Sequence, residues 1–228
     1  MAQSAREWEN RVNQMFADIE QNVAERRETD RGMWFSQWTL LSLVTFGAAW
    51  FLMIYYLINR RNQHFARQEK LEQLVLTRFR QLSNEKQSTL SDSKVGEGGK
   101  EDFAKSRNAS MWAASTLLIL PAFYVFRFLM EDLRKHEEHE SIFFQEVVTY
   151  AKSLELSMNL NGMAPTTKSF ISGRYFVMTL VTLGLAGVYW LYLIFNDYNR
   201  HFKKQWAFED ELLKTLQKTE TSKPNADS

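Results

Sequence analysis

The chain has 228 residues, carries 28 basic against 27 acidic side chains, and is 45% hydrophobic. A net charge of +1 gives no electrostatic reason to expect nucleic acid as a partner, and the absence of cysteine excludes disulfides, thiolate nucleophiles and cysteine-ligated clusters. Nine glycines and three prolines are too few for the many turns of a sandwich or barrel, so long helices are expected.

Residues 1–32 predict an extramembrane amphipathic helix. Apolar side chains recur there at helical spacing with charged side chains between them: Trp8, Val12, Met15, Phe16, Ile19 and Val23. The segment is too rich in charge to contain the apolar core of a secretory signal.

Three long runs without formal charge follow, and each is bounded by charged residues: Arg31 and Arg60, Arg107 and Arg127, and Arg174 and Asp197. A helix needs roughly 20 apolar residues to cross the hydrocarbon core of a bilayer. Each run is long enough to span, the second only just. We therefore predict transmembrane helices at 33–58, 109–130 and 174–196. Pro121 lies inside the second of them and is expected to kink it.

Amphipathic stretches continue each of the three runs. Helical extensions are expected at 59–82, 131–158 and 197–218. The remaining segments are polar or broken by glycine and proline, and they predict a flexible linker at 83–108, a connector at 159–173 and a disordered tail at 219–228.

These elements predict an all-α integral membrane protein with three transmembrane helices and long amphipathic helices on both faces of the membrane. With three crossings, 1–32 and 131–174 share one side, and 59–108 and 197–228 share the other. The second side carries 17 lysine and arginine residues against 10 on the first. This asymmetry favours a plasma-membrane protein with its N-terminus outside and its C-terminus inside.

The first and third spans are related by an internal repeat. When Leu43 is aligned with Leu180, 13 of the 34 positions from Leu43 to Leu76 are identical to their counterparts, without a gap. Outside the apolar part, both copies contain the motif N-x-x-N-x-H-F-x-x-Q, which common hydrophobicity cannot produce. We expect two duplicated spans that are inserted in the same direction.

The repeated polar motif is the first candidate for a binding site. Its histidine and glutamine are four residues apart, so in a helix they share one face. With neighbouring basic residues, two such faces could bind a phosphate or the headgroup of an anionic lipid. The alternative, which we favour, is that the matched side chains hydrogen-bond each other and set the register of the two helices. The residues concerned are Asn59, Arg60, Arg61, Asn62, His64, Gln68, Asn196, Asn199, His201 and Gln205.

The second candidate is the pair His136 and His139, which lie three residues apart among glutamates. Histidines with this spacing can ligate a divalent metal. The remaining histidines are expected on the opposite side of the membrane, however, so no full ligand set is predicted. A solvated helix of mixed charge is the preferred interpretation.

No other constellation in the sequence predicts catalysis. The chain has no glycine-rich phosphate loop and no nucleophile elbow, and the apolar runs contain no acidic residue of the kind that marks an ion-coupled pathway. We expect neither enzymatic activity nor a cofactor.

The segment YWLYLIFNDYNRHFKKQWAFEDELL, at Tyr189–Leu213, resembles a signature of small archaeal and bacterial multi-pass membrane proteins that form a family of unknown function. In that family, an aromatic YW-LY span is followed by N-x-HF and an acidic helix. The first copy of the repeat matches more loosely, because it has RRNQHF and lacks the Tyr-Trp pair. The resemblance implies a prokaryotic lineage, archaeal or bacterial, without implying an activity.

The sequence as a whole predicts a non-catalytic multi-pass membrane protein that acts as an accessory or scaffolding subunit of a larger membrane complex. Its expected partners are the lipid bilayer and other integral membrane subunits, or further copies of the chain. The alternative is a protein that binds or organises anionic lipids through the repeated motif.

Overall fold

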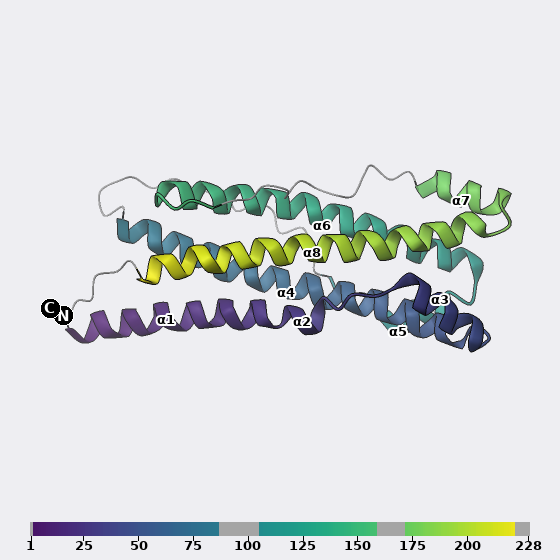
Figure 1. Ribbon diagram of the computed structural model, residues 1–228, viewed down its shortest axis with the longest axis horizontal. Coiled ribbons are helices and arrows are strands. Elements are labelled where there is room, and N and C mark those ends of the chain that lie inside the picture. The colour runs from purple at the N-terminus through teal and green to yellow at the C-terminus, as the bar shows by residue number, and fades with distance from the viewer. Residues whose placement is uncertain (1, 87–104, 159–171, 222–228) are drawn as a thin grey trace.

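The computed structural model describes residues 2–86, 105–158 and 172–221, and every regular element in these ranges is a helix. The predicted all-α fold is confirmed. Figure 1 shows a long, narrow bundle in which α4 (Ala48–Lys86), α6 (Ile119–Ser153) and α8 (Leu185–Thr221) run most of its length. The shorter α1 (Ala2–Ala24) and α2 (Arg26–Thr29) lie along one part of it.

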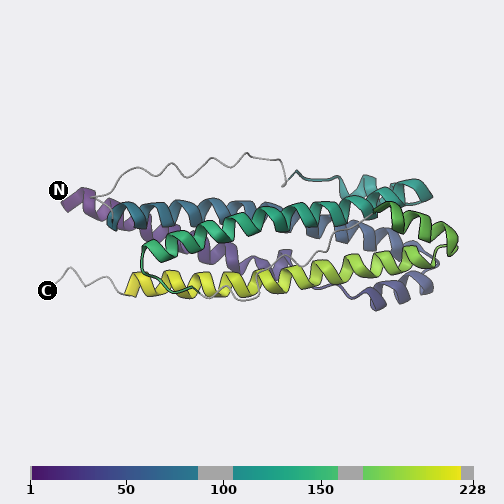
Figure 2. The ribbon, with the colours of Figure 1, turned by 90° about the horizontal axis from the view of Figure 1, so that it is seen from above.

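One half of the bundle is an assembly of α1 with the C-terminal parts of α4, α6 and α8 (Figures 1 and 2). Apolar side chains at three- and four-residue spacing face inward from each helix. The buried members of this core are Ile19, Val23, Leu71, Val75, Phe79, Leu82, Phe143, Phe144, Val147, Ala151, Phe208, Leu212 and Leu216. They come from the stripes predicted within 1–32, 59–82, 131–158 and 197–218.

The prediction that these stripes lie on two faces of a membrane is therefore wrong, because helices separated by a bilayer cannot share one core. The predicted orientation, with the N-terminal segment outside and the C-terminal segment inside, fails for the same reason. Near the end of the bundle, Gln217 of α8 donates a hydrogen bond of 3.4 Å to Glu20 of α1. Helices α1 and α8 therefore contact each other, so they cannot lie on opposite sides of a membrane.

At the other end of the molecule, each long helix is preceded by a short helix that runs in the opposite direction. The pairs are α3 (Phe35–Val44) with α4, α5 (Ala109–Ser115) with α6, and α7 (Ser172–Val181) with α8. The three turns gather at the end that lies farthest from Ala2 and Thr221 (Figures 1 and 2). Each uncharged run is thus a helical hairpin, and the hairpins share a second core that includes Ile54, Leu129 and Ile194.

The turns of the first and third hairpins have the same structure. Gly47 has a φ angle of 90° and Gly184 one of 100°, a region open to glycine but strained for other residues. The N–H of Gly47 donates to the carbonyl of Ser42 at 2.7 Å, and that of Gly184 donates to Thr179 at 2.8 Å. The two copies of the repeat therefore reverse the chain in the same way.

The second hairpin reverses at 116–118 without glycine, and Pro121 follows as the third residue of α6. The N–H groups of the first helical turn have no acceptor within the helix, so proline costs no hydrogen bond there. The expected kink is absent from this position, since Pro121 helps to start a helix instead of interrupting one.

The predicted continuous helices at 33–58, 109–130 and 174–196 are each divided by a turn. Among the described residues, no helix combines the length and the apolar character needed to cross a membrane. Hydropathy measures how apolar a segment is and carries no information on chain direction, so a span and a hairpin of equal composition give the same signal.

Most of the predicted linker, connector and tail lies outside the described residues, at 87–104, 159–171 and 222–228. Where these segments are described, helices continue into them. Helix α4 extends to Lys86, α7 begins at Ser172 and α8 extends to Thr221.

Candidate functional site

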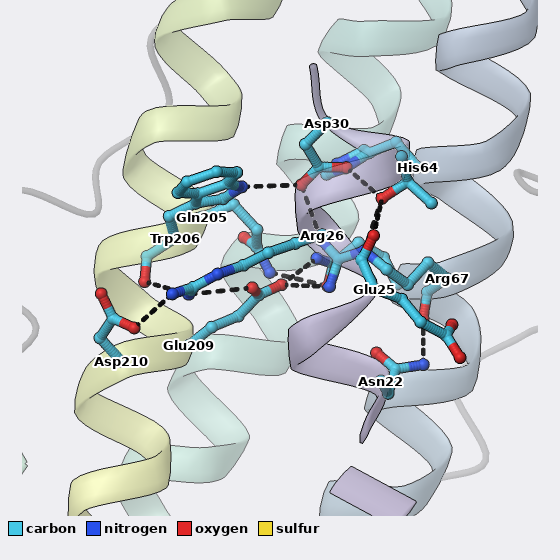
Figure 3. Close-up of polar contacts among 12 residues, drawn as sticks. Asn22, Glu25, Arg26, Asp30, His64, Arg67, Gln205, Trp206, Glu209 and Asp210 are labelled. Atoms are coloured by element: carbon cyan, nitrogen blue, oxygen red, sulfur yellow. Dashed lines mark hydrogen bonds and ion pairs between the residues drawn. The ribbon is translucent and has the colours of Figure 1, made fainter. Parts of the chain in front are cut away.

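A layer of buried polar side chains separates the two apolar cores. It lies where the end of α2 meets the middle of α4, α6 and α8, and Figure 3 shows part of it. Its buried members are Asp30, Arg60, Arg61, His64, Arg67, Gln68, His136, Glu137, Glu140, His201, Gln205 and Glu209. Because buried charges are costly unless they are paired, each of these groups needs a structural or functional explanation.

Asp30, the residue after α2, organises one side of this layer (Figure 3). One carboxylate oxygen lies 2.8 Å from Nδ1 of His64, and the other accepts from Nη2 of Arg67 at 2.8 Å and from Nε1 of Trp206 at 3.1 Å. Burial by itself would raise the pKa of Asp30, but His64 and Arg67 outweigh it and hold the pKa below its usual range. The carboxylate is therefore ionised in the folded protein.

A chain of hydrogen bonds continues from Arg67 to α8. Nη1 of Arg67 donates to Oε1 of Glu209 at 2.7 Å, and Nε2 of Gln68 donates to the same oxygen at 2.6 Å. Nε2 of Gln205 in turn donates to Oε1 of Gln68 at 2.7 Å. This chain fixes the register of α4 against α8.

The two copies of the repeated motif meet in this layer. Gln68 bonds its counterpart Gln205, and Nε2 of His64 lies 3.0 Å from Nε2 of its counterpart His201. The interpretation that the matched side chains bond each other is confirmed for the glutamine pair, and the histidine pair lies within hydrogen-bond distance.

A third histidine, His136 of α6, joins this pair, although three membrane crossings would put it on the opposite side. His64, His136 and His201 are the 17th, 18th and 17th residues of their helices. The second hairpin thus has the same plan as the other two. The signal that was missed is a set of identities that appears when the second hairpin is aligned with the third, without a gap: Leu118/Leu183, Leu120/Leu185, Tyr124/Tyr189, Asp132/Asp197, His136/His201 and Phe143/Phe208.

The three histidines and Glu140 form a buried group that we call the histidine cluster. Its members are 0% to 6% exposed, and one ligand atom from each lies within 4.8 Å of all the others. Oε1 of Glu140 is 3.2 Å from Nε2 of His136, which lies one helical turn earlier. Nδ1 of His201 faces two carboxylates, Glu137 at 3.5 Å and Glu140 at 3.7 Å. These side chains are the ones that could hold a metal ion.

Burial and neighbouring charges set the protonation of the cluster. Burial lowers the pKa of His64 to about 3 and also lowers the pKa of His136, so both rings are neutral at pH 7. Burial would lower the pKa of His201 too, but Glu140 and Glu137 outweigh it and raise that pKa. Burial opposes ionisation of Glu140, yet His201 and His136 outweigh it and lower its pKa. Since His64 is neutral and Asp30 is ionised, Nδ1–H of His64 donates to Asp30, and its Nε2 carries a lone pair.

The other predicted binding residues are engaged within the chain. Nη1 of Arg60 donates to the carbonyl of Arg31 at 2.8 Å and to Oδ1 of Asn199 at 2.9 Å. Arg61 pairs with Asp132 at 3.0 Å.

The asparagines of the motif also lie against the protein. Nδ2 of Asn62 donates to the carbonyl of Arg107 at 2.7 Å, and Nδ2 of Asn199 donates to that of Met33 at 2.7 Å. Asn59 and Asn196 are half-buried. The motif therefore faces the inside of the bundle and does not form the exposed basic surface that headgroup binding needs.

The second predicted metal ligand, His139, lies outside the histidine cluster. It is half-buried, and its Nε2 is 3.0 Å from Oε2 of Glu72. The hydrogen bond with Glu72 raises the pKa of His139, although partial burial opposes this. Of the predicted pair, the structure brings only His136 to the cluster.

Comparisons with known proteins give no information on the function of this site. No family model, curated protein or solved structure matches the chain. The resemblance of Tyr189–Leu213 to a family of small membrane proteins stays a prediction, and function has to be inferred from the geometry.

The hairpin turns carry the most exposed apolar side chains in the described parts of the chain. Phe46 is 100% exposed, Leu183 95% and Leu117 76%, one on each turn. Apart from Ile142, all exposed large hydrophobic side chains in these parts lie within 34–56, 111–124 and 177–192. The hairpin end is thus an apolar surface of the kind that binds a membrane or a protein.

Proposed function

We propose that this is a membrane protein that inserts three apolar hairpins into a lipid bilayer from one side and holds its helical bundle outside. The observation that carries the proposal is the gathering of three exposed apolar turns at one end of the molecule (Figures 1 and 2). Transfer of apolar surface out of water is favourable by roughly 25 cal/mol per Å², so a surface of this kind favours insertion into lipid.

The hairpins have a length that suits insertion without crossing. Helices α3 and α7 have 10 residues each, and 10 helical residues rise about 15 Å. The hydrocarbon core of a bilayer is about 30 Å thick. The first and third hairpins therefore have the length to reach the middle of the bilayer and return, in place of the full crossing expected from hydropathy.

The hairpin turns also satisfy their own polar groups, which hydrocarbon requires because it offers no hydrogen-bond partners. The hydroxyl of Thr45 donates to the carbonyl of Leu41 at 2.8 Å and accepts from the N–H of Ala49 at 2.9 Å. Thr182 makes the equivalent bonds with Met178 at 2.7 Å and with Ala186 at 2.9 Å. These bonds lower the free-energy cost of placing the turns in hydrocarbon, because fewer polar groups are left without a partner.

Exposed aromatic and basic side chains surround the base of the hairpins. Trp34, Tyr56 and Tyr192 are all exposed, and such rings favour the membrane interface. Arg127 and Arg174 are exposed as well. Arg127 is the ninth residue of α6, so it lies about 12 Å from the start of that helix, at the depth of the headgroups.

At the membrane, we propose a non-catalytic accessory or scaffolding role on the cytoplasmic side of the plasma membrane. The apolar sides of the hairpins offer surfaces for other integral membrane subunits or for further copies of the chain. Recognition of anionic headgroups by the repeated motif has less support, because Arg60, Arg61 and His64 are 5%, 3% and 0% exposed.

Charge placed on the turns tests the insertion. We expect the triple variant Phe46→Asp, Leu117→Asp and Leu183→Asp to lose at least ten-fold in liposome binding, because an acidic residue in the bilayer centre costs about 2.5–3.5 kcal/mol. The three side chains are at least 76% exposed, so the fold should not depend on them. The measurement is co-flotation with liposomes, together with helix content by circular dichroism.

The matched control is Ile142→Asp, since Ile142 is 65% exposed but lies on α6 in the bundle, away from the hairpins. It should bind liposomes like the unaltered chain. Undiminished flotation of the triple variant, or failure of the unaltered chain to float, would contradict the proposal.

The accessory role is tested by mild detergent extraction from native membranes, followed by native gel separation and mass spectrometry. We expect reproducible co-migration with another membrane protein. A chain that migrates alone as a monomer would count against this role and leave the insertion untouched.

A further inference from the structure

The three imidazoles of the histidine cluster are arranged with nearly threefold symmetry. Their ring centres are 5.1 Å apart for His64 and His201, 5.3 Å for His136 and His201, and 5.4 Å for His64 and His136. A metal–nitrogen bond of about 2.0–2.1 Å puts a ring centre roughly 3.2 Å from the ion, so three imidazoles at tetrahedral angles have centres roughly 5.2 Å apart. The observed spacing is the spacing that a shared ion requires.

Glu140 supplies a fourth donor from the same face of α6 as His136, one helical turn further along the chain. Nε2 of His136 and Oε1 of Glu140 lie 3.2 Å apart as an ion pair, but neither atom makes a hydrogen bond of good geometry with any described residue. Buried polar atoms are rarely left without a partner, because the loss of hydration is then uncompensated. Two such atoms, grouped within 4.8 Å of ligand atoms of two other histidines, indicate a common ligand.

Further side chains hold the rings in place, as is usual around metal ligands. Asp30 is 2.8 Å from Nδ1 of His64, which leaves Nε2 of that ring directed toward the cluster. Phe65 stacks on His136 with ring centres 4.0 Å apart, and Phe202 lies against His64 at 4.3 Å. Each of these phenylalanines is the residue after a cluster histidine of another helix, so the repeat itself builds the support.

The contact between His64 and His201 has nearly the spacing that a shared ion would give. Their Nε2 atoms are 3.0 Å apart, close to the roughly 3.3 Å that separates two nitrogens on one tetrahedral ion. Two nitrogen lone pairs at this distance repel each other unless a proton or a cation lies between them. A shared proton would satisfy this one pair, but it would leave Nε2 of His136 and Oε1 of Glu140 with only their mutual contact at 3.2 Å.

We propose that His64, His136, His201 and Glu140 together bind one divalent transition-metal ion, and that Zn²⁺ fits this donor set best. Three imidazoles and one carboxylate suit a tetrahedral zinc centre, and four buried protein ligands are typical of a structural site. The ligands come from α4, α6 and α8, so the ion joins the three repeats where the hairpins meet the bundle.

The test uses the full chain in detergent, stripped of metal with a chelator and then titrated with Co²⁺ or Zn²⁺ alone. We expect elemental mass spectrometry to find one equivalent of metal per chain. The cobalt-loaded chain should show the strong visible absorption of four-coordinate Co²⁺. Zn²⁺ should displace Co²⁺ and raise the unfolding temperature, because a ligand that binds the folded state stabilises it. No uptake of either ion at 1:1 stoichiometry by the folded chain would overturn the proposal.

A pair of variants on α6 separates the cluster from ordinary surface binding. His136→Gln should weaken cobalt binding at least 100-fold and abolish the four-coordinate spectrum, whereas His139→Gln, on the same helix but outside the cluster, should leave both unchanged. Equal binding by the two variants would sink the proposal. If His136→Gln does not fold, His201→Gln takes its place, and the effect of the chelator on the unfolding temperature of the unaltered chain still decides the matter.

Discussion

At the scale of single residues, the polar layer shows how one carboxylate can organise several helices. Asp30 contacts His64, Arg67 and Trp206, and through Arg67 it is linked to Glu209 (Figure 3). Buried ion pairs add little net stability, because desolvation offsets their attraction, but they penalise any arrangement that leaves one partner alone. The layer therefore specifies how the helices are aligned more than it stabilises them.

Removal of Arg67 should be strongly destabilising. Its guanidinium is 2.8 Å from Asp30 and 2.7 Å from Glu209, and both carboxylates are fully buried. Arg67→Met leaves two buried acids without this partner, and we expect the free energy of unfolding to fall by about 3–5 kcal/mol. Denaturant unfolding followed by circular dichroism measures this loss.

The control is Arg80→Met on the same helix. Arg80 is 52% exposed and lies 3.8 Å from Glu146, and exposed pairs of this kind contribute under about 1 kcal/mol. A loss for Arg67→Met no larger than that for Arg80→Met would show that Arg67 does not hold the layer together.

At the scale of elements, the protein repeats one unit three times. Each unit is a helical hairpin whose first arm is a short helix and whose second arm is the beginning of a long helix. The short arm and the first turns of the long helix are apolar, the middle of the long helix is polar, and its end is amphipathic. Threonine hydroxyls and glycines with positive φ close the first and third turns. Because the order of segments is the same in all three units, the three histidines lie at the same height along the bundle axis.

Substitution of a turn glycine should destabilise the fold. Gly184 has a φ angle of 100°, and a side chain in a left-handed conformation costs about 1–2 kcal/mol. We expect Gly184→Ala to lower the free energy of unfolding by that amount, as measured by denaturant unfolding in detergent.

Gly173, on the short arm of the same hairpin, provides the comparison. A Cβ added there meets nothing within 4 Å, and alanine is better than glycine inside a helix by about 0.5–1 kcal/mol. Gly173→Ala should therefore be neutral or stabilising. Equal effects of the two substitutions would mean that the turn does not need glycine.

At the scale of the whole molecule, the bundle has two different ends. One carries the three apolar turns, and the other carries the beginning of α1 and the end of α8 (Figures 1 and 2). All amphipathic helices share one core. In the proposed insertion of the hairpin end, every helix of the bundle would lie on one side of the membrane, which differs from the three crossings expected from hydropathy.

Single cysteines distinguish these two arrangements, and the chain has no cysteine of its own. Gln21→Cys, Lys70→Cys, Gln145→Cys and Lys214→Cys each lie at an exposed position on a different helix. A membrane-impermeant maleimide applied to sealed inside-out vesicles should label all four, because the bundle then faces the reagent. Applied to intact cells, it should label none of them.

Labelling of all four after detergent treatment provides the control for accessibility. Three crossings would give a different result, with positions 21 and 145 labelled in cells and positions 70 and 214 labelled in inside-out vesicles. That pattern would contradict the one-sided bundle.

Much of the architecture follows from the sequence because its causes are local. Helical spacing of apolar residues predicts the bundle helices, and the internal repeat predicts that His64 and His201, like Gln68 and Gln205, occupy equivalent positions. Lack of charge predicts three apolar segments. Each of these inferences depends only on side-chain chemistry within a short stretch, or on identity between two stretches.

The direction of the chain was decided only by the tertiary structure. Reversal of a helix needs a few residues in turn conformation, here at 45–47, 116–118 and 182–184, and these leave the hydropathy of the run unchanged. Once the three runs fold back, the amphipathic helices meet in one core, and His136 reaches His64 and His201. The sequence by itself determined which segments are helical and apolar, and the packing of hairpin against hairpin decided how the helices run relative to one another and which side chains meet.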